Sequence, residues 1–244
     1  MSRIAVVCIV FCLALWGINA ATVANPTNQT PQGGEPSYAV DLWRPATQST
    51  GFLDLSPIQL GNGKSTTLEI EVYARTASAC ILSMGDQGTD NFVALQLQDG
   101  NLVVRIGAVN QPNSVATSAG SPIKVNTWTT LSVVITNNDA STASVTAYAN
   151  GAVIINGATT RALTTNTRKK VLIGRCQYNG GLGGGQGAQE LNGIVDNFRV
   201  WDLARSVADI QAFATLISTT VDLDNPAGLI VHFPFVEGML QAFV

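Results

Sequence analysis

The sequence predicts an all-β domain, a sandwich or a barrel, with one short helix near its C-terminal end. From Val40 onward, short segments of alternating apolar and polar residues recur about every ten residues. Turn signals such as Asp99-Gly100 and Asn150-Gly151 separate these segments. One later segment, which begins at Ser206, carries its apolar residues at helical spacing instead.

The first residues of the chain, 1–20, have the pattern of a secretory signal peptide. Arg3 is followed by an uninterrupted apolar run from Ile4 to Trp16, and small and polar residues come after the run. A membrane-spanning helix needs roughly 20 apolar residues, and no later stretch has them. We therefore expect residues 1–20 to be removed, the protein to be secreted, and the mature chain not to insert into a membrane. An uncleaved N-terminal anchor is the alternative.

Residues 21–39 are expected to form a flexible leader, because a segment rich in Pro, Thr, Asn and Gly cannot bury enough apolar surface to fold alone. Asn28 lies in the N-x-T sequence Asn28-Gln29-Thr30 and is a candidate glycosylation site if the secretory route is eukaryotic. The folded domain is expected to comprise residues 40–244.

Removal of residues 1–20 leaves two cysteines, Cys80 and Cys176. An even pair in an oxidising compartment is most simply a disulfide, and two separate buried thiols are the alternative. The same removal leaves 12 basic and 16 acidic residues, a net charge of −4. The longest basic run is Arg168-Lys169-Lys170, so nucleic acid and anionic membranes are not expected as partners. The sequence leaves the oligomeric state open.

The expected strands share the two-residue alternation of a half-buried strand. In chain order they are residues 66–74, 92–98, 101–107, 128–136, 144–149 and 171–174, with a closing strand over 228–238. Asn150-Gly151 is the strongest hairpin signal, because both residues tolerate a positive φ. The helix is expected to have Ser206 as its N-cap, with Asp209 three residues on, and to extend to Ile217.

Residues 178–189 contain six glycines in twelve positions. A phosphate-binding loop would have to lead into a helix whose N-terminus faces the phosphate, but a strand-like segment follows this one. A linker between domains would precede a new set of elements, and only about fifty residues remain. We therefore interpret residues 178–189 as a long loop within one domain.

Several segments, in this order, resemble the laminin-G-like jellyroll of the concanavalin A-like lectin/glucanase superfamily, whose members include the pentraxins. The resemblance rests on Trp128-Thr129-Thr130-Leu131, on Tyr148-Ala149-Asn150-Gly151 and on the run from Gly193 to Ser206, and it covers roughly residues 50–236. It implies an antiparallel β-sandwich of the concanavalin A-like jellyroll type.

The similarity to pentraxins also implies a calcium site. Asp90 and Asn91 match the Asp-Asn pair of that family, and Gln177 and Gln189 match its middle and distal Gln positions. Cys176 departs from the family, which carries Glu there, and sulfur is too soft a ligand for Ca²⁺. Because Ca²⁺ prefers six to eight oxygen ligands, this donor set with one formal charge predicts a weak site. A metal-free pair of hydrogen-bonded loops is the alternative.

Tyr178 and Asn179 lie at the entrance of the glycine-rich loop and are the candidates for direct ligand contact. Tyr178 stands where pentraxins carry Asp, and its ring can stack on a sugar while its hydroxyl group forms a hydrogen bond.

No catalytic site is expected. Asp196 and Asp202 are six residues apart on one strand, which separates them by roughly 20 Å, whereas the carboxyl groups of retaining glycosidases are about 5 Å apart. Glu69 and Glu71 alternate with core residues and are expected to be solvated. His232, the single histidine, lies in an apolar strand and is expected to be packed or hydrogen-bonded.

These observations together predict a secreted, non-catalytic recognition module that binds glycan or glycoprotein ligands with the assistance of Ca²⁺. An adhesive module of the extracellular matrix that binds protein without metal is the alternative. A glycoside hydrolase is a third and weaker reading, because the paired carboxylates of such enzymes are not found.

Overall fold

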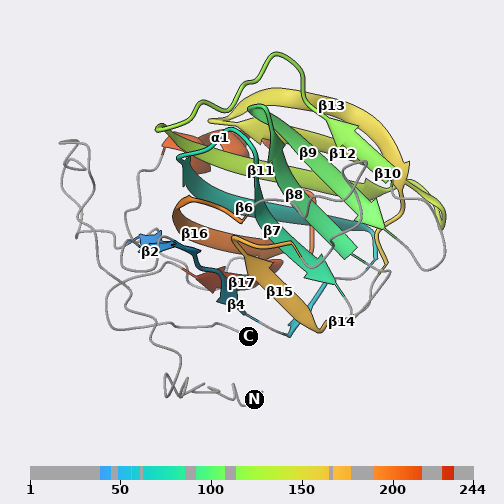
Figure 1. The fold of residues 1–244 in the computed structure, drawn as a ribbon. Coiled ribbons are helices and arrows are strands. Elements are labelled where there is room, and N and C mark those ends of the chain that lie inside the picture. The colour runs from blue at the N-terminus through green and yellow to red at the C-terminus, as the bar shows by residue number, and fades with distance from the viewer. Residues whose placement is uncertain are drawn as a thin grey trace.

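The computed structural model describes residues 39–44, 49–55, 57–60, 63–85, 92–107, 114–164, 167–176, 190–215 and 227–233. Within these ranges the chain forms two large antiparallel sheets and one short α-helix (Figure 1). The structure thus confirms the all-β prediction and decides between its two forms in favour of the sandwich.

The larger sheet has seven strands, in the order β1-β16-β6-β11-β12-β13, and β1 and β17 pair with successive parts of β16. Its strands are β1 (Val40–Asp41), β6 (Ser65–Ala74), β11 (Trp128–Asn137), β12 (Thr142–Ala149), β13 (Ala152–Arg161), β16 (Gly193–Trp201) and β17 (Leu229–Phe233).

The smaller sheet has six strands, in the order β10-β9-β8-β7-β15-β4. Its strands are β4 (Leu53–Asp54), β7 (Ala79–Gly85), β8 (Phe92–Gln98), β9 (Asn101–Gly107), β10 (Ser114–Thr117) and β15 (Lys170–Ile173). Two ribbons of two strands complete the fold, namely β2 (Trp43–Arg44) with β3 (Ser49–Thr50), and β5 (Ile58–Gln59) with β14 (Thr167–Arg168).

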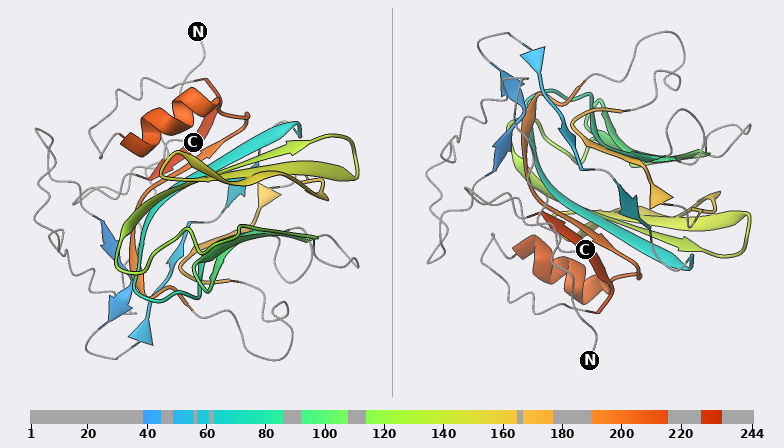
Figure 2. Two further views of the ribbon diagram at one scale, coloured as in Figure 1. Left: turned by 90° about the horizontal axis from the view of Figure 1, so that it is seen from above. Right: turned by 90° about the horizontal axis from the view of Figure 1, so that it is seen from below.

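The two large sheets pack face to face and enclose one continuous hydrophobic core (Figure 2). Alternation along β6 places Leu68, Ile70 and Val72 in this core and turns the residues between them to the outer face. Helix α1 (Val207–Thr215) lies on the outer face of the larger sheet (Figure 2). There Ile210 packs against Val134 of β11 and Tyr148 of β12.

Most of the expected elements form close to their predicted bounds. The strands expected over 92–98 and 101–107 are β8 and β9, and the others up to residue 174 differ at their ends by a few residues. The closing strand expected over 228–238 includes β17, and residues 234–238 lie outside the described part of the chain. Asp99, Gly100, Asn150 and Gly151 all have positive φ, as the predicted hairpin turns require. Helix α1 begins directly after Ser206, whose hydroxyl accepts a hydrogen bond from the Asp209 backbone N–H. The described helix ends at Thr215, short of Ile217.

Candidate functional site

The predicted disulfide is present. Cys80 of β7 and Cys176, which follows β15, are joined with a Cα–Cα distance of 5.5 Å, and both half-cystines are buried. They form a buried cluster with Phe92 and Ala94 of β8 on the outer face of the smaller sheet. We call this surface the disulfide face and define it by Cys80, Phe92, Ala94, Gln96, Arg105 and Cys176.

Strand alternation explains how these residues come to share one face. In β8, Val93 and Leu95 point into the core, so the intervening Ala94 and Gln96 point outward. In β9, Arg105 lies directly opposite Ala94 and therefore faces the same side. The disulfide face is thus built from neighbouring strands that pair in regular register.

A chain of hydrogen bonds crosses the disulfide face. The Arg105 Nε donates to Gln96 Oε1 at 2.7 Å, and Gln96 Nε2 donates to Cys176 Sγ at 3.1 Å. Arg105 is only 9% exposed and Gln96 5% exposed. Burial lowers the pKa of Arg105 from its ordinary value. The face therefore holds an arginine whose side chain is largely covered.

Glycine is required at one position on this face. A Cβ atom added to Gly107 would lie 2.1 Å from an atom of the Phe92 ring, so the ring occupies the space that a side chain would fill. Phe92 and Gly107 are directly opposite each other in the β8–β9 pair. The close approach fixes the aromatic ring at the point where the chain enters β8.

The residues predicted to bind calcium or ligand lie outside the described part of the chain. These are Asp90, Asn91, Gln177, Tyr178, Asn179 and Gln189, and the predicted glycosylation site Asn28 lies outside it as well. The structure does place the residues that flank the two loops, namely Gly85, Phe92, Cys176 and Glu190.

The two predicted loops start from different ends of β7. Gly85 pairs with Phe92 at the end of β7 from which residues 86–91 depart. Near the other end of β7, Cys80 is bonded to Cys176 and forms a bridge with Glu190, so both ends of the loop 177–189 are attached there. Five residues of a strand span about 17 Å. Convergence of the predicted ligands therefore requires the loops to reach across the disulfide face.

One prediction about the opposite face of the molecule is wrong. Glu69, expected to be solvated, is fully buried on the outer face of the larger sheet. Its carboxylate accepts hydrogen bonds from Trp201 Nε1 at 2.8 Å and from Arg205 Nη1 at 2.7 Å. The Arg205 guanidinium lies 4.4 Å from the centre of the Trp201 ring. Residues more than 130 positions later in the chain therefore cover this carboxylate.

A pair of carboxyl groups lies beside Glu69. Asp196 and Glu71 are directly opposite each other in the β16–β6 pair, and Asp196 is buried. Burial and the charge of Glu71 raise the pKa of Asp196 to about 8, and burial raises the pKa of Glu71 to about 7. Two like charges this close disfavour double ionisation, so the pair holds a proton near neutral pH.

The single histidine is packed, as predicted. His232 is buried, and its Nε2 lies 3.4 Å from Asn197 Oδ1. Burial and the nearby charge of Arg199 lower the pKa of His232 to about 3. The ring is therefore neutral across the physiological range and contributes no charge to this face.

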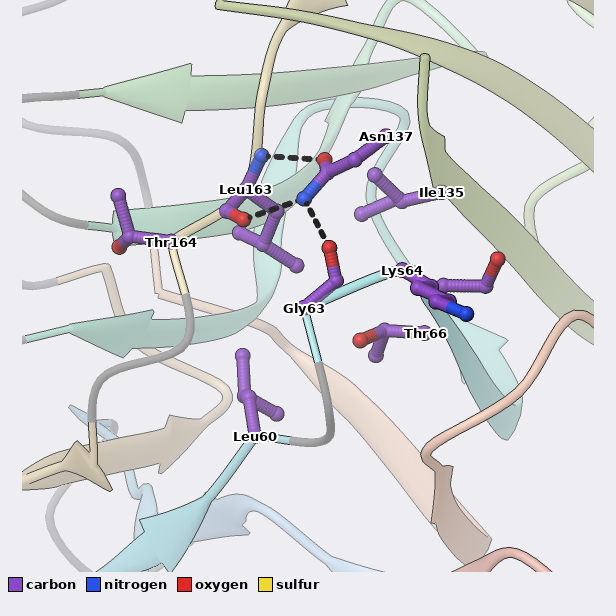
Figure 3. A pocket seen from close by; sticks show the side chains of 9 residues that line it. Leu60, Gly63, Lys64, Thr66, Ile135, Asn137, Leu163 and Thr164 are labelled. Carbon is purple, nitrogen blue, oxygen red and sulfur yellow. Dashed lines mark hydrogen bonds between the residues drawn. The ribbon is translucent and has the colours of Figure 1, made fainter. Parts of the chain in front are cut away.

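Two hollows lie among the described residues. A groove of about 550 Å³ at the rim between β10 and β13 is lined mainly by hydroxyl side chains and by Arg161. A much smaller cavity of about 10 Å³, which suits one water molecule, is lined by residues including Leu60 and Lys64 (Figure 3). There Asn137 binds Gly63 O and both backbone groups of Leu163 (Figure 3), so this cavity belongs to the scaffold.

Metal-binding groups of three or more His, Cys, Asp or Glu side chains do not occur in the part of the chain that the structure describes. In the same part, the helix is neither long nor apolar enough to cross a membrane.

The chain belongs to the concanavalin A-like lectin/glucanase superfamily, whose laminin-G-type family model matches residues 47–211. This confirms the resemblance seen in the sequence. Among curated proteins, none matches the chain in sequence.

Solved structures with a similar fold include a heptameric pentraxin from Limulus polyphemus, which is 17% identical, with a TM-score of 0.50 over 79% of this chain and 84% of the pentraxin. Domain 4 of an extracellular arabinanase from Geobacillus stearothermophilus, solved with arabinotriose, is 16% identical, with a TM-score of 0.49 over 68% of this chain and 73% of that domain. A carbohydrate-binding module of a Ruminococcus gnavus sialidase, bound to α2,3 sialyllactose, is 12% identical, with a TM-score of 0.44 over 66% of this chain and 97% of that module. At these identities the pentraxin likeness supports the fold alone.

Proposed function

We propose that the protein is a secreted, non-catalytic recognition module for glycan or glycoprotein ligands. The observation that carries the proposal is the disulfide face, where a buried cluster of polar and apolar side chains lies on the outside of a sheet between the roots of two loops. Membership of the superfamily supports the same assignment. This cluster combines apolar side chains with a few oriented polar groups, as the lining of small-ligand sites does.

Secretion is part of the proposal. A disulfide between two buried half-cystines, 96 residues apart in sequence, is typical of proteins that fold in an oxidising compartment. The signal-peptide pattern of residues 1–20 supports the same location.

Calcium assistance is the finer part of the proposal, and it rests on residues 90, 91, 177 and 189. Cys176, at the family's Glu position, has no side-chain oxygen to offer, and its sulfur is bonded to Cys80. The remaining set of Asp90, Asn91, Gln177 and Gln189 brings one formal negative charge. Sites with few charged ligands bind Ca²⁺ weakly, so we expect this site to be filled at the millimolar Ca²⁺ concentrations found outside cells. Bound Ca²⁺ would supply a positive centre for ligand hydroxyl or acidic groups.

The test compares glycan-array binding and thermal melting of the mature chain in millimolar Ca²⁺ and in EDTA. We expect Ca²⁺ to raise both the melting temperature and glycan binding, and we expect Asp90→Ala to abolish the calcium effect. Asp54→Asn is the matched control, because Asp54 lies in a half-exposed ion pair with Lys170. Glycan binding that is equal in Ca²⁺ and EDTA would refute the calcium assistance alone. Absence of glycan binding in both buffers would refute the recognition function.

A further inference from the structure

Arg105 differs from Arg75, Arg175, Arg199 and Arg205 in what surrounds its charge. Four arginines face carboxylates, namely Arg75, Arg175, Arg199 and Arg205. Within the described residues, Arg105 has no such partner: its one hydrogen bond goes from Nε to the neutral amide of Gln96. Its guanidinium charge is thus left without a counter-ion although the residue is only 9% exposed.

An uncompensated buried charge is unfavourable for the folded state. Taking a charged group out of water is costly unless an opposite charge and hydrogen bonds replace the water. The surroundings of Arg105 disfavour its positive charge, since burial lowers its pKa. An apolar residue at this outward position of β9 would avoid that cost. The guanidinium is therefore better explained by a use in binding than by a contribution to stability.

The hydrogen bond to Gln96 uses Nε of Arg105 and leaves its two terminal nitrogens available. Nε is engaged by Gln96, and the terminal nitrogens of Arg105 are not among the described side-chain atoms that are fully buried without a partner. They therefore still reach solvent. Gln96 is itself fixed by its hydrogen bond to Cys176, so the residue that orients the Arg105 guanidinium is held in place. A guanidinium held in this way presents two parallel N–H groups, the arrangement that binds carboxylate or sulfate oxygens in pairs.

An exposed apolar residue lies beside Arg105 in the sheet. Arg105 lies directly opposite Val115 of the edge strand β10, and Val115 is 43% exposed. On its other side Arg105 lies opposite Ala94 of β8. A saccharide has both kinds of surface, since the C–H face of its ring is apolar and an acidic substituent is charged. The combination of Arg105 and Val115 matches such a ligand better than it matches a free inorganic ion.

We infer that Arg105, held by Gln96, is the anion-recognising residue of the disulfide face and directs the module toward acidic saccharides that carry a carboxylate or a sulfate. This inference rests on the proposed recognition function and specifies its ligand class. It requires no calcium, because the positive charge is supplied by the protein itself.

The first experiment measures the anion site without a glycan. The mature chain is melted in sodium sulfate, sodium acetate or sodium chloride at matched ionic strength, and we expect sulfate or acetate to raise the melting temperature above its value in chloride. Arg105→Met should reduce this difference to the general stabilisation that sulfate gives folded proteins, and Arg105→Lys, which keeps the charge but not the fork of donors, should reduce it less. Lys124→Met is the matched control, since Lys124 is an exposed lysine that binds Ser121 O.

The second experiment measures glycan binding. Oligogalacturonate is compared with its methyl ester, and a sulfated galactan with the unsulfated polymer, so that the two pairs distinguish carboxylate from sulfate. We expect at least one acidic form to bind more tightly than its neutral counterpart. Arg105→Met should weaken that form about ten- to hundredfold, the loss expected when one charged hydrogen-bonded contact is removed, and should leave the neutral forms unchanged.

The outcomes separate this inference from the proposed function. Equal binding of acidic and neutral glycans, unaffected by Arg105→Met, would overturn the inference and leave the recognition function standing. An anion effect that depends on Arg105 without binding of any glycan would support the anion site and refute the recognition function. If Arg105→Met does not fold, the comparison of salts between the wild type and the Arg105→Lys variant still decides the matter. Equal melting in all three salts would overturn the inference.

Discussion

Glu69 and Asp196 lie on adjacent strands of the same outer face, but the two carboxyl groups have different neighbours. Glu69 has a cation beside it, because Arg205 donates a hydrogen bond to one of its oxygens. Trp201 donates to the other oxygen. Asp196 faces the carboxyl group of Glu71 and accepts a hydrogen bond from the Asn197 backbone N–H. Burial raises the pKa of both carboxyl groups; Arg205 and Trp201 counteract that rise at Glu69, whereas the charge of Glu71 adds to it at Asp196.

The Asp196–Glu71 pair predicts that stability decreases as the pH rises toward 8. Both pKa values are raised on folding, Asp196 from 3.8 to about 8 and Glu71 from 4.5 to about 7, so the folded state binds more protons and loses stability with rising pH in that window. His232 acts in the opposite direction between pH 3 and 6.5, because its pKa is lowered. The net decrease should therefore be steepest just above pH 6.5.

We expect Asp196→Asn to flatten this profile. The substitution removes one titrating group and the like charge beside Glu71, and each proton contributes about 1.4 kcal/mol per pH unit to the slope. Urea unfolding between pH 6 and 9 measures the slope, and Asp54→Asn should keep that of the wild type. A wild-type free energy of unfolding that is constant over this range would contradict the prediction.

At the scale of single residues, the sequence predicts which face of the sheet a side chain points to better than it predicts how deeply that side chain is buried. Alternation correctly turns Glu69 outward from the core, but nothing near Glu69 in the sequence indicates that Trp201 and Arg205 cover it. The same limit applies to Arg105, which the sequence analysis did not single out. The visible signal was a lone charge within the apolar run 101–107, and its missing counter-ion is a property of the assembled face.

Among the elements, helix α1 illustrates how one amphipathic segment stabilises the outer face of the larger sheet. Ile210 is almost fully buried against Val134 and Tyr148, whereas Val207 is 51% exposed on the same helix. Ile210→Ala should lower the free energy of unfolding by about 2–5 kcal/mol, because it leaves a cavity under the helix. Val207→Ala should change it by less than about 0.5 kcal/mol. Urea unfolding of both variants tests the difference, and equal effects would contradict it.

Element prediction succeeded where the signal is local. The Asn150-Gly151 and Asp99-Gly100 turns have the positive φ values that their residue types favour, and the strands on either side pair in register. Strand β13 extends to Arg161, well beyond the apolar residues that follow the turn, because pairing with β12 continues through a polar stretch. The loops predicted to bind calcium lie outside the described residues, so that part of the site remains a prediction.

At the scale of the whole molecule, the disulfide connects strands that are distant in sequence. Cys80 and Cys176 are 96 residues apart, and the bond attaches the end of β15 to the start of β7. Replacing both residues by Ala should lower the free energy of unfolding by about 2–5 kcal/mol, chiefly by restoring freedom to the unfolded chain. Denaturant unfolding of the double variant and of the reduced wild type should give the same loss. An unchanged midpoint in both would contradict the prediction.

The same bond has a consequence for proteolysis. The segment between Cys80 and Cys176 includes the exposed turn at residues 138–141, as well as most of the smaller sheet. A protease that cuts once anywhere in this segment produces two polypeptides that are still covalently joined. In a protease-rich extracellular medium, a nicked molecule would therefore retain all its strands in one particle until a reductant separates them.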